Sequence, residues 1–147
     1  MPGKRYPIPC PSCAAKRAAI FGAYLAEKVL ADVGHAEWVL TIPKMLRPYF
    51  LHHRELLGRL CQAAAETIAE LIDAATAEDV RIRPGIITVL QTARSDLRWS
   101  PHIHALVSRG GWTRKGLWVP VPFVDTRAAE KLFRHKVISF LQDEGLL

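Results

Sequence analysis

The chain has 147 residues, of which 50% are hydrophobic and 23% are charged, which is the composition of a folded domain rather than of a disordered segment. Twenty lysines and arginines against fourteen aspartates and glutamates give a net charge of +6, which favours a polyanionic partner such as a nucleic acid without proving one. A membrane-spanning helix needs about 18 apolar residues in a row, and the sequence contains neither such a run nor a secretory signal peptide. The three cysteines, an odd number, fit a reducing cytosol better than a disulfide framework.

The first half of the chain predicts two helices around one strand. Residues 1–13 are rich in proline, glycine and basic side chains, and we expect them to be irregular. A helical pattern follows over 14–33, and the β-rich run 37–42 predicts the first strand. We expect a turn or loop over 45–51, which contains a proline, and then a long helix over about 53–75.

The second half predicts three strands and a helix. Strands are expected over 86–92 and 101–108, the latter ended by a Gly-Gly pair, and a weaker edge strand over 117–121. Asp125 is placed to cap a final helix. Because short turns join neighbouring strands, we expect antiparallel pairing with the helices packed on one face. The sequence therefore predicts an α+β sandwich of the ferredoxin-like type.

Two histidines are the strongest candidates for chemistry. His102 and His104 alternate along the predicted strand 101–108, so their side chains share one face at a spacing of about 6.6–7 Å. Two imidazoles so placed can converge on one divalent ion and leave positions open for a further ligand and for substrate oxygens. The alternative is a pair of partly exposed histidines that form hydrogen bonds to their neighbours.

Gln91, on the preceding predicted strand, is the nearest candidate for a third metal ligand. Its amide oxygen is a hard donor that suits Mg²⁺ or Mn²⁺. A simple hydrogen-bonding role among apolar neighbours is the alternative.

Arginines and tryptophans bracket the histidine strand, and we expect them to contact DNA: Arg94, Arg98, Trp99, Arg109 and Trp112. Guanidinium groups bind phosphates through two hydrogen bonds, and an indole can stack on an unpaired base. Solvated loop arginines and tryptophans packed at the rim of the sheet are the alternatives.

Cys10 and Cys13 have the spacing of half a zinc site. A structural zinc needs four ligands, and the sequence offers no second pair with this spacing. We therefore expect Zn²⁺ only if the other half of a finger is supplied.

Three motifs of the chain resemble those of a known family. They are Thr41-Ile42-Pro43-Lys44 with Leu46-Arg47-Pro48-Tyr49-Phe50, then Ser95-Asp96-Leu97-Arg98-Trp99 running into Pro101-His102-Ile103-His104-Ala105-Leu106-Val107, and Cys10-Pro11-Ser12-Cys13 followed by Ala15-Lys16-Arg17. This pattern resembles the two-tyrosine rolling-circle transposases of insertion sequences, and the resemblance runs from about Cys10 to Leu147.

The resemblance implies the HUH endonuclease fold, in which an H-x-H pair holds Mg²⁺ or Mn²⁺ against a scissile phosphate. It also implies that a tyrosine attacks this phosphate, leaving a 5′-phosphotyrosine link and a free 3′-OH. His102 and His104 match the metal ligands of the family. Gln91 lies in the preceding strand, and a ligand role for it remains a hypothesis.

Two departures from the family pattern shape the expected domains. The paired tyrosines of the family lie downstream of the histidines, whereas Tyr6, Tyr24 and Tyr49 all precede them without the Y-x-x-x-Y spacing. The earlier cysteines of the zinc finger are also missing. We therefore expect residues 1–13 to be the remnant of a finger and residues 14–147 to be an HUH-type catalytic domain that is incomplete at its C-terminus.

The expected function is that of a cytoplasmic transposase fragment. It would bind single-stranded DNA for metal-dependent nicking and strand transfer in rolling-circle transposition, and it would be inactive alone because the nucleophilic tyrosines are missing. The alternative is a non-catalytic basic DNA-binding module, in which His102 and His104 contact phosphate or merely pack.

Overall fold

The computed structural model describes residues 10–77 and 80–147, and the chain divides into two compact units, Met1–Val33 and Gly34–Leu147. In the first unit, helix α1 (Pro11–Tyr24) continues into a π-helical turn, η1 (Leu25–Val29). The helix includes residues 11–13, which we expected to be irregular. The cause is Pro11, whose fixed φ suits the first position of a helix, where no N–H is needed. Most of the segment expected to be a finger remnant lies outside the described residues.

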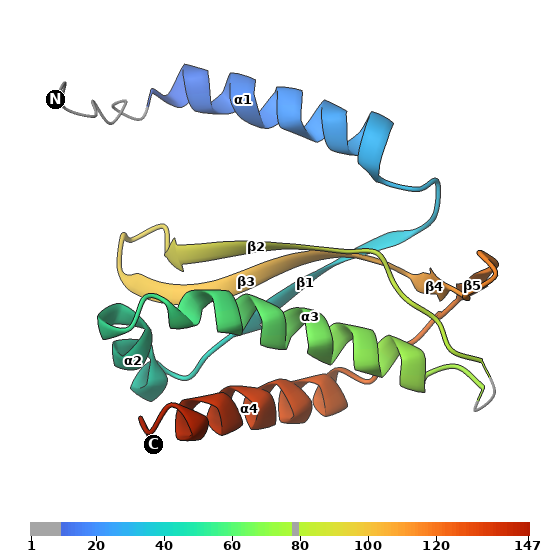
Figure 1. Cartoon of the computed structure of the whole chain (residues 1–147). Helices are drawn as coiled ribbons and strands as arrows, with labels where there is room; N and C mark the ends of the chain where they lie inside the picture. The colour runs from blue at the N-terminus through green and yellow to red at the C-terminus, as the bar shows by residue number, and fades with distance from the viewer. Residues whose placement is uncertain (1–9, 78–79) are drawn as a thin grey trace, which may run out of the picture. The chain divides into compact units, whose positions relative to one another are not determined.

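The second unit is built on a three-stranded antiparallel sheet (Figure 1). Its strands are β1 (His35–Thr41), β2 (Ile86–Ala93) and β3 (Trp99–Ser108), in the order β1-β3-β2. Both β1 and β2 pair antiparallel with β3. The strand that carries the two histidines is therefore the central one.

A short two-stranded sheet, β4 (Gly110–Trp112) and β5 (Trp118–Pro120), follows β3. The strand β3 ends at Ser108 as expected, and the Gly-Gly pair that follows it begins β4. A Cβ on Gly110, which has a φ of +151°, would collide with the carbonyl oxygen of Val119. A Cβ on Gly111 would lie 2.8 Å from the carbonyl oxygen of Arg83. Only glycine allows the chain to approach its neighbours this closely.

The stretch expected to be a loop over 45–51 is helical, with a 3₁₀ turn, η2 (Lys44–Leu46), leading into helix α2 (Arg47–His52). Pro48 lies in the first turn of α2, where its missing N–H costs nothing. Phe50 is fully buried, with its ring edge-on to Phe140 at a centroid distance of 6.1 Å. The burial of this ring explains why the segment is ordered as a helix.

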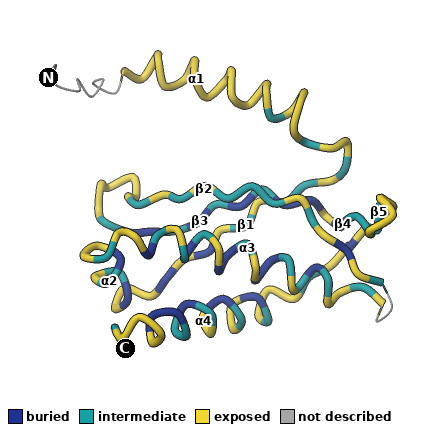
Figure 2. The backbone as a smooth tube through the Cα atoms, viewed as in Figure 1, coloured by how far each residue is buried: buried dark blue, intermediate teal, exposed yellow. Residues whose placement is uncertain are grey.

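Helices α3 (Leu56–Ala74) and α4 (Thr126–Asp143) cover one face of the three-stranded sheet (Figure 1). Asp125 caps α4 as expected, since its Oδ1 accepts a hydrogen bond from the backbone N–H of Arg127 at 2.9 Å. Buried stretches of β3, α3 and α4 form the core (Figure 2). Its central members are Ile103, Ala105 and Val107 of β3, Leu60 and Ile68 of α3, and Phe133, Val137 and Leu141 of α4. The predicted α+β class with helices on one face is confirmed.

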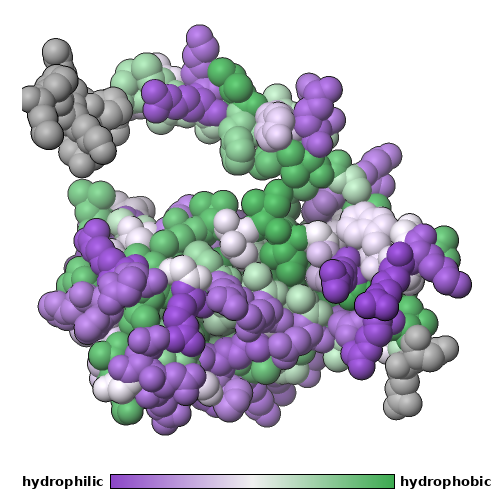
Figure 3. Space-filling view, viewed as in Figure 1, coloured by the Kyte–Doolittle hydropathy of each residue, from purple (hydrophilic) through white to green (hydrophobic). Residues whose placement is uncertain are grey.

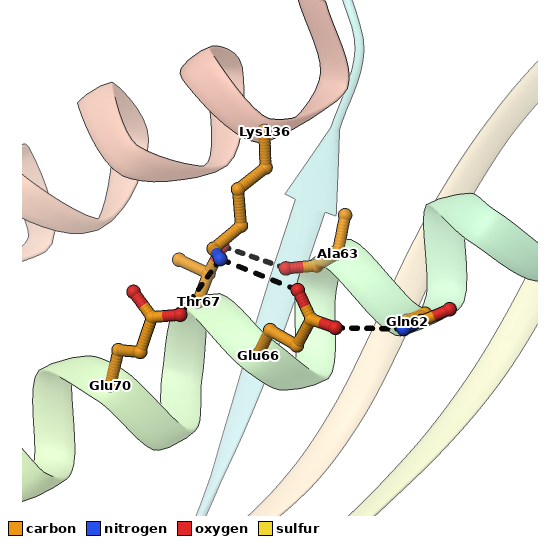
Figure 4. A network of polar contacts seen from close by, with 6 residues as sticks. All are labelled: Gln62, Ala63, Glu66, Thr67, Glu70 and Lys136. Atoms are coloured by element: carbon orange, nitrogen blue, oxygen red, sulfur yellow. Dashed lines mark hydrogen bonds and ion pairs between the residues drawn. The ribbon is translucent and has the colours of Figure 1, made fainter. Parts of the chain in front are cut away.

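The solvent-facing side of α3 and α4 is held by charged contacts (Figure 4). Lys136 Nζ donates to Glu70 Oε1 at 2.7 Å and to Glu66 Oε2 at 3.3 Å. The hydrogen bond to Glu70 raises the pKa of Lys136, with a smaller contribution from Glu66. Hydrophilic residues cover much of this surface (Figure 3). Within the described ranges, no helix is both long and apolar enough to cross a membrane.

Candidate metal and nucleic-acid site

The two candidate ligands lie on the face of the sheet opposite α3 and α4, which we call the histidine face. Ile103 and Ala105 point into the core, so the alternating side chains of His102 and His104 point to the other side. Their ring centroids are 5.1 Å apart, with an interplanar angle of 62°. The strand period thus places the two imidazoles side by side, as the sequence predicted.

Hydrogen bonds fix which nitrogen of each imidazole is available. His102 Nδ1 lies 2.6 Å from the backbone carbonyl oxygen of Ser100. His104 Nδ1 lies 2.7 Å from Glu37 Oε1. Because a carbonyl and a carboxylate can only accept, each Nδ1 is the donor. When the rings are neutral, the Nε2 lone pairs are therefore the ones left for a ligand.

Glu37 is a functional candidate that sequence reasoning missed. Around metal-binding histidines, a carboxylate commonly accepts a hydrogen bond from the ring nitrogen that does not bind the metal. This contact orients the ring and makes the other nitrogen a stronger ligand. Glu37 lies on β1, opposite Leu106, and reaches diagonally to His104. The alternation of side chains along β1 predicts that Glu37 points to the histidine face. Its contact with His104 depends in addition on the register between β1 and β3.

Gln91 is the direct partner of His102 in the β2–β3 pairing, so both side chains belong to the histidine face. Gln91 is exposed there, whereas we expected it among apolar neighbours. Within residues 10–77 and 80–147, no group of three or more His, Cys, Asp or Glu side chains could hold a metal. Two imidazoles and one amide oxygen nevertheless fit a divalent cation that keeps positions open for substrate oxygens.

Arg94 and Arg98 lie in the turn between β2 and β3, at the end of the sheet nearer His102. Arg94 N donates to the carbonyl oxygen of Arg98 at 3.1 Å, and Leu97 adopts a φ of +61° to close the turn. Arg98 Nε lies 3.4 Å from Asp96 Oδ2, and its side chain is 83% exposed. The Arg94 and Arg98 side chains are both exposed to solvent.

Trp99 is held by packing. Its indole nitrogen donates to the carbonyl oxygen of Arg47 at 3.0 Å, and the Arg54 guanidinium lies 5.3 Å from the ring centroid. One face of the indole is thus occupied by a cation of the same chain. This geometry favours the packing alternative for Trp99 over base stacking.

Arg109 and Trp112 lie beyond the other end of β3. Arg109 Nη2 donates to the carbonyl oxygen of Pro122 at 3.3 Å. Trp112 stacks at a tilt on Trp118, with centroids 4.6 Å apart. Arginines therefore lie beyond both ends of β3, as expected. Trp112, like Trp99, packs against another side chain of the protein.

Comparisons with known proteins agree with the motifs. Residues 85–145 match the Y2_Tnp family, described as "Putative transposase". The chain is 35% identical over 114 residues to the transposase for insertion sequence element IS801 of Pseudomonas savastanoi pv. phaseolicola, a match that covers 78% of the chain and 26% of that protein. Over most of its own length, the chain is similar to one part of an insertion-sequence transposase.

A second transposase relative is y4qJ of Sinorhizobium fredii, described as "Putative transposase", with 29% identity over 118 residues. This match covers 77% of the chain and 29% of the relative. The chain thus spans between a quarter and a third of the length of these curated relatives.

The fold of the chain is similar to a solved structure of the conjugative relaxase TrwC, which is described as a metal-free complex with oriT DNA. The TM-score is 0.53 at 13% sequence identity, and the match covers 89% of this chain and 56% of the relaxase chain. Relaxases have the HUH fold, so the predicted fold is confirmed.

Cys10 and Cys13 belong to the first unit. Both are exposed thiols, Cys10 just before α1 and Cys13 in its first turn. A hydrogen bond from the backbone N–H of Cys13 is the largest of the contacts that lower the pKa of Cys10. Their role as half of a zinc site remains a prediction.

Proposed function

We propose that this transposase segment binds single-stranded DNA across the histidine face and holds Mg²⁺ or Mn²⁺ there for nicking and strand transfer in rolling-circle transposition. The observation that carries the proposal is the pair of hydrogen bonds made by the Nδ1 atoms of His102 and His104. They orient two adjacent imidazoles so that Nε2 is the nitrogen left for a cation.

Each residue of the proposed site has a distinct role. His102 and His104 would hold the cation, with Gln91 as the third protein ligand. When bound, the cation polarises a phosphoryl oxygen of the scissile phosphate. Arg94 and Arg98 hold neighbouring phosphates by hydrogen bonding and charge, which keeps the strand in register with the histidines.

The covalent step is not assigned to this segment. Tyr49 packs against the hydrophobic core, and Tyr24 belongs to the first unit. Neither has the Y-x-x-x-Y spacing of the family. We therefore expect metal-dependent binding of single-stranded DNA without a covalent protein–DNA adduct.

The test compares two double variants by calorimetry with Mn²⁺. His102→Ala with His104→Ala removes both proposed ligands, while His52→Ala with His135→Ala removes two exposed helical histidines as a matched control. We expect the first variant to lose Mn²⁺ binding and the second to retain it. Unaltered binding in the first variant would reject the metal site.

A non-catalytic DNA-binding module is the second candidate, favoured by the net charge of +6. The two candidates differ in how DNA binding responds to metal. Fluorescence anisotropy with a labelled single-stranded oligonucleotide should show tighter binding in Mn²⁺ than in a chelator if the first is correct. Equal affinity in both conditions would favour the module. A denaturing gel of the same mixture checks for the adduct.

A further inference from the structure

A second basic surface lies around the β4–β5 sheet, away from the histidine pair along the chain. Arg83 and Trp112 exchange both of their backbone hydrogen bonds: Arg83 N donates to Trp112 O at 2.9 Å, and Trp112 N donates to Arg83 O at 3.0 Å. Arg83 therefore forms an isolated β-bridge with Trp112 of β4. This pairing brings Arg83 close to the turn after β4.

A hollow of about 640 Å³ lies at this junction, and we call it the arginine hollow. Three arginines line it, Arg81, Arg83 and Arg114, together with Trp112 and Asp73. The volume lies within the roughly 300–1,000 Å³ typical of ligand sites. Three arginines in one hollow are suited to an anion with several oxygens.

One carboxylate only partly balances this charge. Arg81 Nη1 lies 2.6 Å from Asp73 Oδ2, while Asp73 Oδ1 accepts a hydrogen bond from the backbone N–H of Ile82 at 2.9 Å. In the part of the chain that the structure describes, neither Arg83 nor Arg114 forms an ion pair. Among the described residues that line the hollow, three arginines and one aspartate leave a net charge of +2.

The hollow lies close enough to the histidine pair for one nucleic-acid strand to contact both. The strand β4 follows β3 after a single residue, so Trp112 is eight residues from His104 along the chain. At about 3.3 Å per residue this separation is at most roughly 26 Å. A stacked DNA strand advances about 3.4 Å per nucleotide, so this span corresponds to at most roughly eight nucleotides.

We propose that the arginine hollow holds the sugar–phosphate backbone of the DNA strand that crosses the histidine face, within roughly eight nucleotides of the histidine pair. This inference rests on the proposed function, because it takes the histidine face as the site of the same strand. Arg83 and Arg114 supply the phosphate contacts, and Trp112 on Trp118 supports the backbone that carries them.

The experiment measures single-stranded DNA affinity over a series of salt concentrations for the full chain. Arg83→Gln with Arg114→Gln is compared with Arg127→Gln and Arg134→Gln, which remove the same charge from exposed positions of α4. Losing two contacts should make the slope of log affinity against log salt shallower by about 1.4, with about tenfold weaker binding at low salt. The control should keep the wild-type slope.

Three further readouts make the outcome decisive. Arg114→Gln alone, in an exposed turn, should give about half of the slope change without affecting folding. The effect should appear with oligonucleotides longer than about eight nucleotides and vanish with much shorter ones. Mn²⁺ affinity should not change. An unchanged slope, an equal loss in the α4 control, or an effect that persists with the shortest oligonucleotides would overturn the proposal.

The two proposals fail in distinguishable ways. If the histidine double variant still binds Mn²⁺ while the arginine variant loses DNA affinity as described, the metal site is wrong and the arginine hollow stands as a DNA contact. If the arginine variant matches wild type while the histidine variant loses Mn²⁺, only the inference about the hollow is overturned.

Discussion

Glu37 Oε1 on β1 lies 2.7 Å from Nδ1 of His104 on β3. The contact is diagonal, because the direct cross-strand partner of Glu37 is Leu106 and that of His104 is Val39. The side chain of Glu37 is 66% exposed and that of His104 is 31% exposed, so as a surface ion pair the contact adds little to stability. Its consequence is orientation of the ring.

Glu37→Ala should therefore weaken metal binding more than folding. Losing an orienting carboxylate typically lowers metal affinity by about 10- to 100-fold, and we expect a loss of about tenfold for Mn²⁺ by calorimetry. Unfolding free energy should change by less than about 1 kcal/mol. Glu130→Ala on the exposed surface of α4 is the matched control. Equal Mn²⁺ affinity in the two variants would contradict a role for Glu37.

Gln91→Ala tests the third ligand. Because Gln91 lies directly opposite His102, loss of its amide oxygen should reduce Mn²⁺ affinity while leaving the pairing of β2 with β3 intact. Gln91→Glu should bind Mn²⁺ more tightly than wild type, since a carboxylate is the stronger ligand for hard cations. Gln142→Ala, at an exposed site on α4, controls for loss of a surface amide. If both Gln91 variants bind Mn²⁺ like wild type, Gln91 has only a hydrogen-bonding role.

Asp73 should make stability depend on pH in the acid range. The hydrogen bond from the backbone N–H of Ile82, followed by that from Arg81, lowers the pKa of Asp73 below its ordinary value of 3.8. A lowered folded-state pKa stabilises the fold above the unfolded-state pKa, and this contribution is lost as pH falls through the folded value. Asp73→Asn should cost about 1 kcal/mol at neutral pH.

The measurement for Asp73 is urea unfolding at several pH values. The stability difference between wild type and Asp73→Asn should shrink as the pH falls below about 4. Asp143→Asn, near the end of α4, serves as the control. A difference that stays constant from neutral to acid pH would show that the carboxylate charge is not what holds the segment.

Gly110→Ala should disrupt the β4–β5 sheet. Its φ of +151° disfavours a side chain, and the added Cβ would collide with the carbonyl oxygen of Val119. We expect a loss of about 1–3 kcal/mol in unfolding free energy and a change in the fluorescence of the Trp112–Trp118 pair. Gly58→Ala in α3, where a Cβ meets nothing within 4 Å, should instead stabilise the protein slightly. A Gly110→Ala variant as stable as wild type would contradict the conclusion that the start of β4 requires glycine.

Local patterns were enough to predict the elements that depend on local physics. Strand alternation placed His102 and His104 on one face, and Asp125 marked the start of the last helix. The prediction of a loop over 45–51 is wrong because Pro48 lies in the first turn of a helix, where proline is tolerated.

The remaining features depend on contacts between distant residues. Glu37 and His104 are 67 positions apart, so their contact follows from the register of two strands and not from either strand alone. Arg83 and Arg114 come together only because Arg83 pairs with Trp112. Neither arrangement has a signature within a short window of sequence.

The central position of β3 sets how the histidine site should respond to a ligand. Its backbone is hydrogen-bonded along both edges, so the spacing of the two imidazoles is set by three strands together. The amide protons of His102 and His104 should accordingly be among the slowest in the chain to exchange with solvent. A ligand that arrives at such a pair needs to order little of the protein, so most of its interaction energy remains available for binding.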